Sequence, residues 1–325
     1  MEKTNDILSP EIRIKVIGAG GAGNSVLERL VEDGITNENV ELIAVNTDAR
    51  ALKYMQNIGV KTLQIGENLT NGYGTGGNLD KGEKAAEDDA ENLKEIIRDA
   101  EIIFLTAGFG GGVGTGTIPV LAKLAREMGI LCVGIVTMPF AFEGGKRRKI
   151  AEAGLEKVKD VMDALIIIEN NSLLKIVDKK LSIEDAFREA DSVLRNGIRL
   201  IYELVMQIGF INVDFADVKS LLKSSDKSEA ILGIGESESR SVVEAVQKTI
   251  NSPLLSHTIK GAGAIIFNIY ASEMLELSAI EEAMEYIKKE TQRDDIDVFL
   301  GVTLDENIGE KIRTMLIATD FQEES

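Results

Sequence analysis

The sequence predicts an α/β protein in which a mostly parallel sheet lies between helix layers and one long helix joins it to a smaller α/β domain. Short apolar segments alternate with helical ones through the first half of the chain. Several of these segments are apolar throughout, which is typical of strands covered on both faces. Residues 183–207 then keep a helical spacing of apolar residues without a break.

In the first half, each strand-like run is followed by a helical pattern. Strands are expected at residues 12–17, 40–45, 102–106, 131–136 and 165–168, and helices at 24–32, 83–99, 117–127 and 146–161. The polar cluster Asn46, Thr47 and Asp48 is suited to capping a short helix behind the second strand. This alternation predicts a parallel sheet with helices packed on it.

The long helix separates this half from a second region. At about 25 residues it would measure roughly 37 Å, enough to cross a domain. After Gly209 we expect strands at 230–234, 264–270, 296–302 and 314–318, with helices near 239–250 and 272–289. The chain is therefore divided into an N-terminal domain (1–182), a central connecting helix (183–209) and a C-terminal domain (210–325).

Composition and charge exclude several classes of function and location. The net charge is −18, and so acidic a surface repels nucleic acid and anionic lipid. No apolar run approaches the roughly 20 residues that span a bilayer, and the first ten residues lack a signal peptide. The single cysteine, Cys132, cannot form an internal disulfide. We expect a cytoplasmic protein with no nucleic-acid partner and no direct membrane insertion.

Glycine is concentrated early: 22 of the 31 glycines lie at or before Gly145. Residues 18–23 match G-x-G-x-x-G between a strand and a helix, the pattern of a Rossmann dinucleotide site. The acidic residue expected for ribose at the end of the second strand is missing, because Val45 is followed by Asn46. Tight packing of the helix on the strand is the other reading of these glycines.

Residues 110–116 carry the stronger signal, with five glycines in seven positions. A structural turn needs one or two glycines, whereas such a run lets successive N–H groups converge on an anion at a helix N-terminus. Residues 72–78 are also glycine-rich and fit either a loop that orders around a terminal phosphate or plain flexibility. The P-loop pattern G-x-x-x-x-G-K-[ST] does not occur.

With these runs placed, the sequence resembles the FtsZ family, the tubulin-like GTPases of prokaryotic cell division, from about Ile12 to Phe321. Residues 110–116 resemble the family's tubulin signature, and residues 18–24, 46–48 and 72–78 resemble its three other phosphate loops. The resemblance implies a tubulin-like fold with a Rossmann-type GTP-binding sheet. It also implies GTP or GDP as ligand, Mg²⁺ held mainly through the phosphates, and a monovalent cation as a further candidate ligand.

The resemblance also implies contacts residue by residue. In the phosphate loops these are Gly20, Gly21, Ala22, Asn24, Asn46, Gly74, Gly76, Gly110, Gly111, Gly112, Val113, Gly114, Thr115 and Gly116. Glu143 would bind the ribose with Arg147 nearby, Asn170 and Asp191 would hydrogen-bond guanine, and Phe187 would stack on it. Phe187 also fits a core position on its helix, whereas an inward-facing Asp191 needs donors, which guanine offers.

Catalysis is assigned by the same resemblance to Asn212, Asp214 and Asp217, which match the family's synergy loop. Read locally, Asp214 fits an N-cap and Asp217 the first turn of the next helix. Most of a helix of roughly 37 Å separates Asp191 from Asp214, so one subunit cannot easily bring both to one nucleotide. A head-to-tail pair can, and repetition of that contact gives a filament, here the division-site ring.

Two substitutions relative to the family are expected to matter, and the position of the chain end is a further difference. Val113 stands where the family has threonine, which removes a hydroxyl and slows turnover more than it weakens binding. Ile208 replaces a proline before the synergy loop. The chain ends at Ser325, so the C-terminal segment that binds the family's division-ring adaptor proteins is expected to be absent.

Two other functions compete with a polymerising GTPase. A dinucleotide-dependent oxidoreductase would use residues 18–23 but leaves residues 110–116 and the acidic segment unexplained, and the sole histidine, His257, lies in the other domain. A nucleotide-dependent scaffold with little or no hydrolysis is the alternative that Val113 keeps open.

Overall fold

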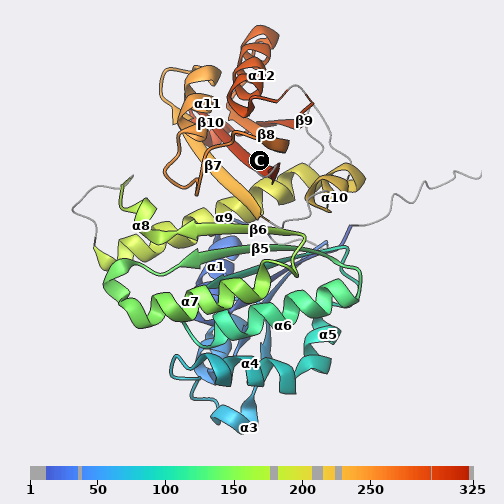
Figure 1. Ribbon diagram of the computed structural model, residues 1–325, viewed down its shortest axis with the longest axis vertical. Coiled ribbons are helices and arrows are strands. Elements are labelled where there is room, and N and C mark those ends of the chain that lie inside the picture. The colour runs from blue at the N-terminus through green and yellow to red at the C-terminus, as the bar shows by residue number, and fades with distance from the viewer. Residues whose placement is uncertain are drawn as a thin grey trace, which may run out of the picture.

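The fold is that of a computed structural model, which describes residues 12–35, 39–175, 182–206, 215–223, 229–293 and 295–321. For residues 204–206 and 217 it describes the backbone alone. Figure 1 shows a lower, larger part built on a parallel sheet, an upper, smaller part, and a long helix that lies between them. The helices of the lower part cover both faces of its sheet.

Six parallel strands build the N-terminal part of the sheet. They are β1 (Ile14–Ala19), β2 (Val40–Asn46), β3 (Lys61–Gln64), β4 (Ile102–Gly108), β5 (Leu131–Met138) and β6 (Ala164–Glu169). Their order in space is β3-β2-β1-β4-β5-β6. The order reverses between β1 and β4, and in open α/β sheets a crevice forms at the carboxyl ends of the strands at such a point.

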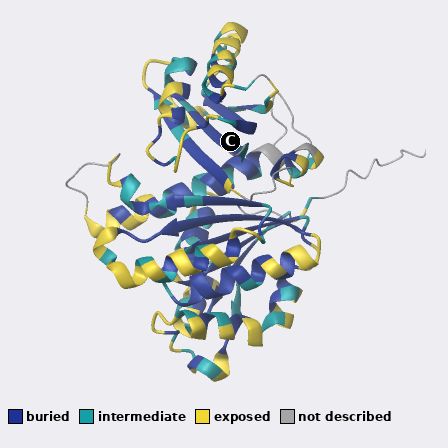
Figure 2. Ribbon diagram, in the orientation of Figure 1, coloured by how far each residue is buried: buried dark blue, intermediate teal, exposed yellow. Residues whose placement is uncertain are grey.

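Two helix layers cover this sheet. On one face lie α1 (Gly20–Glu32), α2 (Ala49–Asn57) and α9 (Ile183–Met206), whose buried side chains share one core cluster. On the other lie α4 (Leu79–Asp88), α5 (Ala90–Ile97), α6 (Val113–Glu127) and α7 (Gly145–Val158). Short helices α3 (Glu67–Thr70), α8 (Asn170–Leu173) and η1 (Ala141–Glu143) complete the domain. Figure 2 shows buried strands beneath helices that each expose one face.

The C-terminal part continues the same sheet. It comprises α10 (Phe215–Lys223), β7 (Glu229–Ser237), α11 (Val242–Ile250), β8 (Ala262–Ala271), α12 (Leu277–Thr291), β9 (Asp297–Leu304), η2 (Glu306–Ile308) and β10 (Ile312–Phe321). Its strands follow β6 in the order β7-β10-β8-β9. Within the described ranges, none of the helices has the length and apolar character that crossing a bilayer requires.

The joint between the two parts of the sheet is narrow. In the described chain, β6 pairs with β7 through Leu165 with Glu229 and Ile166 with Ala230. By comparison, β10 pairs with β8 along most of its length. Contacts of α9 with both parts must therefore contribute to holding them together.

The predicted fold class is confirmed, with local corrections. Helices expected at 24–32 and 117–127 begin earlier, at Gly20 and Val113, so parts of two glycine runs lie in first helical turns rather than in loops. The expected long helix is α9, while the domain boundaries at 182 and 209 stay a prediction. The sequence reading missed β3 and α3.

The single helix expected at 83–99 is wrong, because the chain forms α4 and α5 with a break at Asp89. The Asp89 carboxylate accepts a hydrogen bond from the backbone N–H of Gly66 at 2.7 Å and another from Asn92 Nδ2 at 2.9 Å. A side chain that bonds backbone outside its own helix favours a helix end over a helix interior. The break therefore has a tertiary cause that no helical periodicity reveals.

Packing requires several of the glycines in residues 110–116, in addition to the anion-binding role that their pattern predicts. A Cβ on Gly112 would lie 2.2 Å from Thr75 Oγ1, and one on Gly116 would lie 2.3 Å from the backbone nitrogen of Glu83. A Cβ on Gly114 would lie 3.0 Å from the carbonyl oxygen of Ala19. Gly116 thus allows the close approach of α6 to α4, Gly114 allows its approach to β1, and Gly112 allows its approach to the loop before α4.

We predict that Gly116→Ala destabilises the protein by about 1–3 kcal/mol, because its methyl group meets backbone that cannot move aside. Helix propensity alone would give the opposite sign. Urea denaturation measures the change. Gly111→Ala is the matched control, since nothing lies within 4 Å of its Cβ position. Equal stability of the two variants would refute the packing role of Gly116.

Candidate nucleotide-binding site

A hollow of about 320 Å³ opens at the carboxyl ends of β1, β4 and β5. It is bounded by the N-termini of α1 and α6, by η1 and α7, and by α8 and α9. Its lining residues are Ala19, Gly20, Gly21, Ala22, Thr75, Gly77, Gly108, Phe109, Gly111, Gly112, Val113, Gly114, Thr137, Pro139, Glu143, Arg147, Asn170, Phe187, Ala190 and Asp191. The hollow therefore lies where the strand order reverses.

One end of the hollow suits an anion. Neither α1 nor α6 has a side chain that caps its N-terminus, and neither carries an acidic residue in its first turn. First-turn N–H groups have no partner within their own helix, and the helix dipole favours negative charge there. Gly20 has a φ of +71°, and its Cβ position is 3.0 Å from the backbone nitrogen of Gly114. Two helix N-termini thus converge on one place, which favours phosphate.

The other end offers hydrogen-bond acceptors. Asn170 is 3% exposed, and its Oδ1 has no hydrogen-bond partner among the described residues. Asp191 lines the same end from α9. A buried acceptor without a partner is costly, so a donor supplied by a ligand would stabilise it.

Burial raises the pKa of Asp191 to about 7, an effect that the Arg29 guanidinium opposes and the Glu28 carboxylate reinforces. Carboxyl groups with raised pKa values in a hollow are typical of functional sites. A ligand that donates hydrogen bonds to both Asp191 oxygens would stabilise the ionised form. Asn170 and Asp191 together therefore match a ligand edge rich in donors.

An aromatic cluster lies beside these acceptors. Phe187 of α9 is 39% exposed and meets the buried ring of Phe140 edge to face, with centroids 5.3 Å apart. Phe142 stacks on Phe140 at 5.0 Å. Phe187 is thus neither a plain core residue nor fully solvated, and it presents ring surface to the hollow. A planar base suits that surface.

Glu143 and Arg147 form the third wall. Glu143 Oε1 accepts a hydrogen bond from the backbone N–H of Phe140 at 2.9 Å, and Arg147 Nη1 donates to Glu143 Oε2. The backbone N–H of Ala141 donates to Asn171 Oδ1 at 2.9 Å, which ties η1 to α8. The Glu143 carboxylate is therefore held at the rim, where a sugar hydroxyl could reach it.

Several predicted contacts do not line the hollow. Asn24 and Asn46 lie buried beneath it: Asn24 Nδ2 donates to the carbonyl of Gly18, and Asn46 Nδ2 donates to Asn24 Oδ1 at 2.8 Å. Thr115 Oγ1 is turned to the backbone N–H of Gly110, and Gly116 packs on α4. Gly74, Gly76 and Gly110 are also outside the lining, although their neighbours Thr75, Gly77 and Gly111 belong to it.

Most of the predicted catalytic segment lies outside the described residues. Asn212, Asp214 and the substituted Ile208 lie outside the described residues. Asp217 lies in α10, and of this residue the backbone alone is described. Their roles stay predictions.

Four residues that line the hollow were not predicted from the sequence: Gly108, Phe109, Thr137 and Ala190. Thr137 is a polar residue near the carboxyl end of a strand whose residues are all buried, which is the signal that could have found it. Ala190 follows from Phe187 and Asp191, since all three share one face of α9.

The strand order and the hollow at its reversal point define a nucleotide-binding α/β protein. Family comparison agrees: the Tubulin/FtsZ family GTPase domain matches residues 13–178, and the FtsZ family C-terminal domain matches residues 228–322. The chain belongs to the Tubulin/FtsZ family, and its N-terminal part is a GTPase domain of that family.

Solved structures agree with this assignment. FtsZ of M. jannaschii, solved as an empty dimer, is 39% identical over 95% of this chain and 88% of that one, with a TM-score of 0.87. A mutant of the same FtsZ gives 39% identity, coverage of 96% and 92%, and a TM-score of 0.88. CetZ2 from Haloferax volcanii, a GTPγS-bound protofilament, shares the fold at 22% identity, 96% and 94% coverage, and a TM-score of 0.78.

We predict that Asp191→Asn stabilises the ligand-free protein above pH 7. Because the folded-state pKa is raised to about 7, the folded protein keeps a proton that the unfolded chain loses above about pH 4. The free energy of unfolding therefore falls as pH rises through that window. The pKa shift from 3.8 to about 7 corresponds to roughly 4 kcal/mol, so the variant should be more stable than wild type by up to about 4 kcal/mol at pH 8, with little difference near pH 4.

Thermal denaturation across pH 4–8 measures this effect. Glu189→Gln, an exposed position on the same helix, is the control and should show no such trend. A stability difference for Asp191→Asn that does not vary with pH would contradict the buried carboxylate.

Proposed function

We propose that the chain binds GTP in this hollow and hydrolyses it within a head-to-tail filament that forms the cytokinetic ring of a dividing prokaryotic cell. The main support for GTP over ATP is the Asn170 Oδ1, which has no hydrogen-bond partner among the described residues and lies in the same hollow as the Asp191 carboxylate. Guanine presents an N1–H and a 2-amino group on one edge, whereas adenine presents a ring acceptor there. Two acceptors therefore select guanine.

Each part of the hollow then has a role. The first turns of α1 and α6 hold the phosphates with backbone N–H groups, which offsets a net charge of −18 that repels polyphosphate at long range. Phe187 stacks on the base, and Glu143 accepts from a ribose hydroxyl while Arg147 neutralises it. Mg²⁺, held mainly through the nucleotide phosphates, would supply charge neutralisation during hydrolysis.

Residues of the neighbouring subunit position the water that attacks the γ-phosphate. About 22 Å of helix lie between Asp191 and the end of α9 at Met206. Asp214 and Asp217 follow that end, so they act on the nucleotide of the next subunit, where they position and polarise the water. Relatives described as a dimer and as a protofilament support a head-to-tail assembly. Division-ring adaptor proteins are the proposed further partners.

A scaffold with little hydrolysis is the second candidate, and Val113 favours it. Val113 lines the hollow at the start of α6 and offers no hydroxyl to a phosphate or a water. Light scattering with GTP, GDP and NAD, together with phosphate release, separates the candidates. Assembly with GTP and phosphate release that rises steeply above a threshold protein concentration supports the GTPase, whereas assembly without release supports the scaffold.

In that assay we predict that Asp217→Ala keeps GTP binding but lowers turnover by roughly a hundredfold or more, because positioning of the water is lost. Asp88→Ala, which removes an exposed carboxylate from α4, is the matched control. Turnover near wild type in Asp217→Ala would contradict the shared site.

Nucleotide choice gives an independent prediction. Asp191→Asn should weaken GTP binding by about tenfold or more and strengthen binding of xanthosine triphosphate, because the asparagine amide donates to the C2 carbonyl of xanthine. Equilibrium titration of the unassembled protein with both nucleotides measures the switch. An unchanged preference for GTP would show that Asp191 does not read the base.

A further inference from the structure

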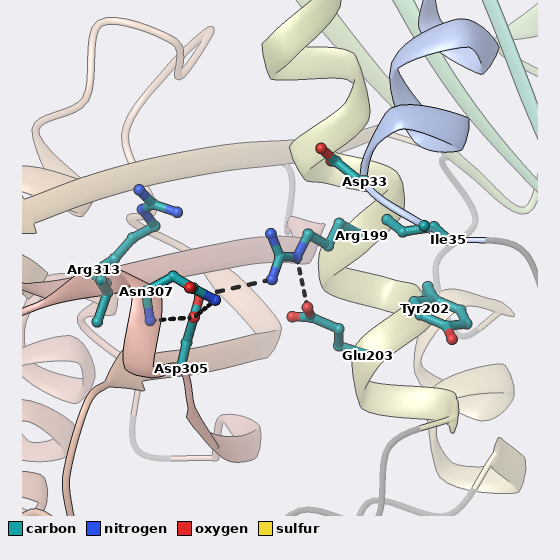
Figure 3. A pocket seen from close by; sticks show the side chains of 10 residues that line it. Asp33, Ile35, Arg199, Tyr202, Glu203, Asp305, Asn307 and Arg313 are labelled. Atoms are coloured by element: carbon teal, nitrogen blue, oxygen red, sulfur yellow. Dashed lines mark hydrogen bonds and ion pairs between the residues drawn. The ribbon is translucent and has the colours of Figure 1, made fainter.

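A second hollow lies further along the long helix, where the two parts of the protein meet (Figure 3). Its volume is about 470 Å³, and it shares no lining residue with the nucleotide hollow. The lining comes from the end of α1, from α9 and from the segment around η2, and it is strongly polar: Asp33, Gly34, Ile35, Arg199, Tyr202, Glu203, Asp305, Asn307, Ile308 and Arg313. Polar groups therefore dominate the contact between the domains here.

A buried carboxylate bridges this joint. Glu203 of α9 is 5% exposed, and its Oε1 accepts a hydrogen bond from Arg199 Nε at 2.6 Å. Its Oε2 accepts from the hydroxyl of Tyr270, on β8, at 2.5 Å. Burial and the neighbouring carboxylate both raise the pKa of Tyr270, so its hydroxyl remains a donor. We call Arg199, Glu203 and Tyr270 the α9–β8 bridge.

Two further ion pairs lie next to the bridge. Arg199 Nη2 lies 3.9 Å from Asp305 Oδ2, and Figure 3 shows this side chain reaching from the helix toward the segment after β9. One turn earlier, Arg195 Nη1 lies 3.3 Å from Asp33 Oδ1 at the end of α1. Residues 195, 199 and 203 lie on one face of the helix. That face therefore connects α1, whose other end lines the nucleotide hollow, to the C-terminal domain.

The geometry of this joint depends on the bridge for two reasons. The sheet itself joins the domains through two residue pairs in the described chain, and the rest of the joint is apolar packing that α9 shares with both domains. A buried charge with its hydrogen bonds tolerates little displacement, because an unpaired buried carboxylate is costly. Apolar side chains, in contrast, keep most of their contact when elements shift slightly.

We propose that Glu203 and Tyr270 are positioning residues for GTP turnover: their hydrogen bond fixes the C-terminal domain on α9 at the angle that lets it complete the next subunit's site. The inference rests on the proposed head-to-tail hydrolysis. The bridge touches neither the nucleotide hollow nor the hydrolysed bond. It therefore affects turnover in the assembled state and does not change nucleotide binding by a single subunit.

The test is Tyr270→Phe, which removes one hydroxyl and keeps the ring. At saturating GTP we expect kcat to fall about fivefold or more, while the dissociation constant of GTP for unassembled protein stays within twofold of wild type. Glu203→Gln removes the charge and, with its oxygen on Tyr270, turns an NH2 group toward the Arg199 N–H donor, so it should lower kcat as well. Tyr286→Phe, the same change at a half-buried position on α12, is the control and should match wild type.

The outcomes separate the possibilities. An unchanged kcat in Tyr270→Phe overturns the proposal. A fall in kcat accompanied by an equal loss of GTP affinity and a lower melting temperature also overturns it, because that pattern marks general destabilisation. A wild-type protein that binds GTP but releases no phosphate refutes the proposed hydrolysis itself, and this result appears before any variant is made.

Discussion

The close approach of α6 to β1 and α4 is the constraint on which the nucleotide hollow depends. A Cβ at Gly114 would touch the carbonyl oxygen of Ala19, and a Cβ at Gly116 would overlap the backbone of α4. Because these side chains are absent, the first turn of α6 lies beside the first turn of α1, and both sets of N–H groups face one place. The glycine run thus serves packing, and the anion site is what that packing produces.

The long helix α9 links the remaining functions. Near its start, Phe187 and Asp191 line the base end of the hollow, and further along Glu203 meets the C-terminal domain. Because a helix is stiff, displacement at one of these places is transmitted to the other. The hollow lined by Phe187 and Asp191 and the domain joint at Glu203 therefore lie on one stiff element, which suits the proposed active site shared between two subunits.

The sequence was enough to predict the features that depend on local pattern. Continuous apolar runs predicted the buried parallel strands, and an unbroken helical spacing predicted α9. Features with a tertiary cause were out of reach. The break at Asp89 depends on a bond to Gly66, and the Tyr270–Glu203 bond joins residues 67 positions apart. Gly111 and Gly116 look alike in the sequence, yet one faces open space and the other faces backbone.

The most direct test of the account is a crystal structure of this protein with GDP. Phosphate oxygens should lie within hydrogen-bond distance of the first-turn N–H groups of both α1 and α6. The N1–H and 2-amino groups of guanine should point at Asn170 and Asp191, with the base against Phe187. A nucleotide bound elsewhere, or a base turned away from Asn170 Oδ1, would contradict the account.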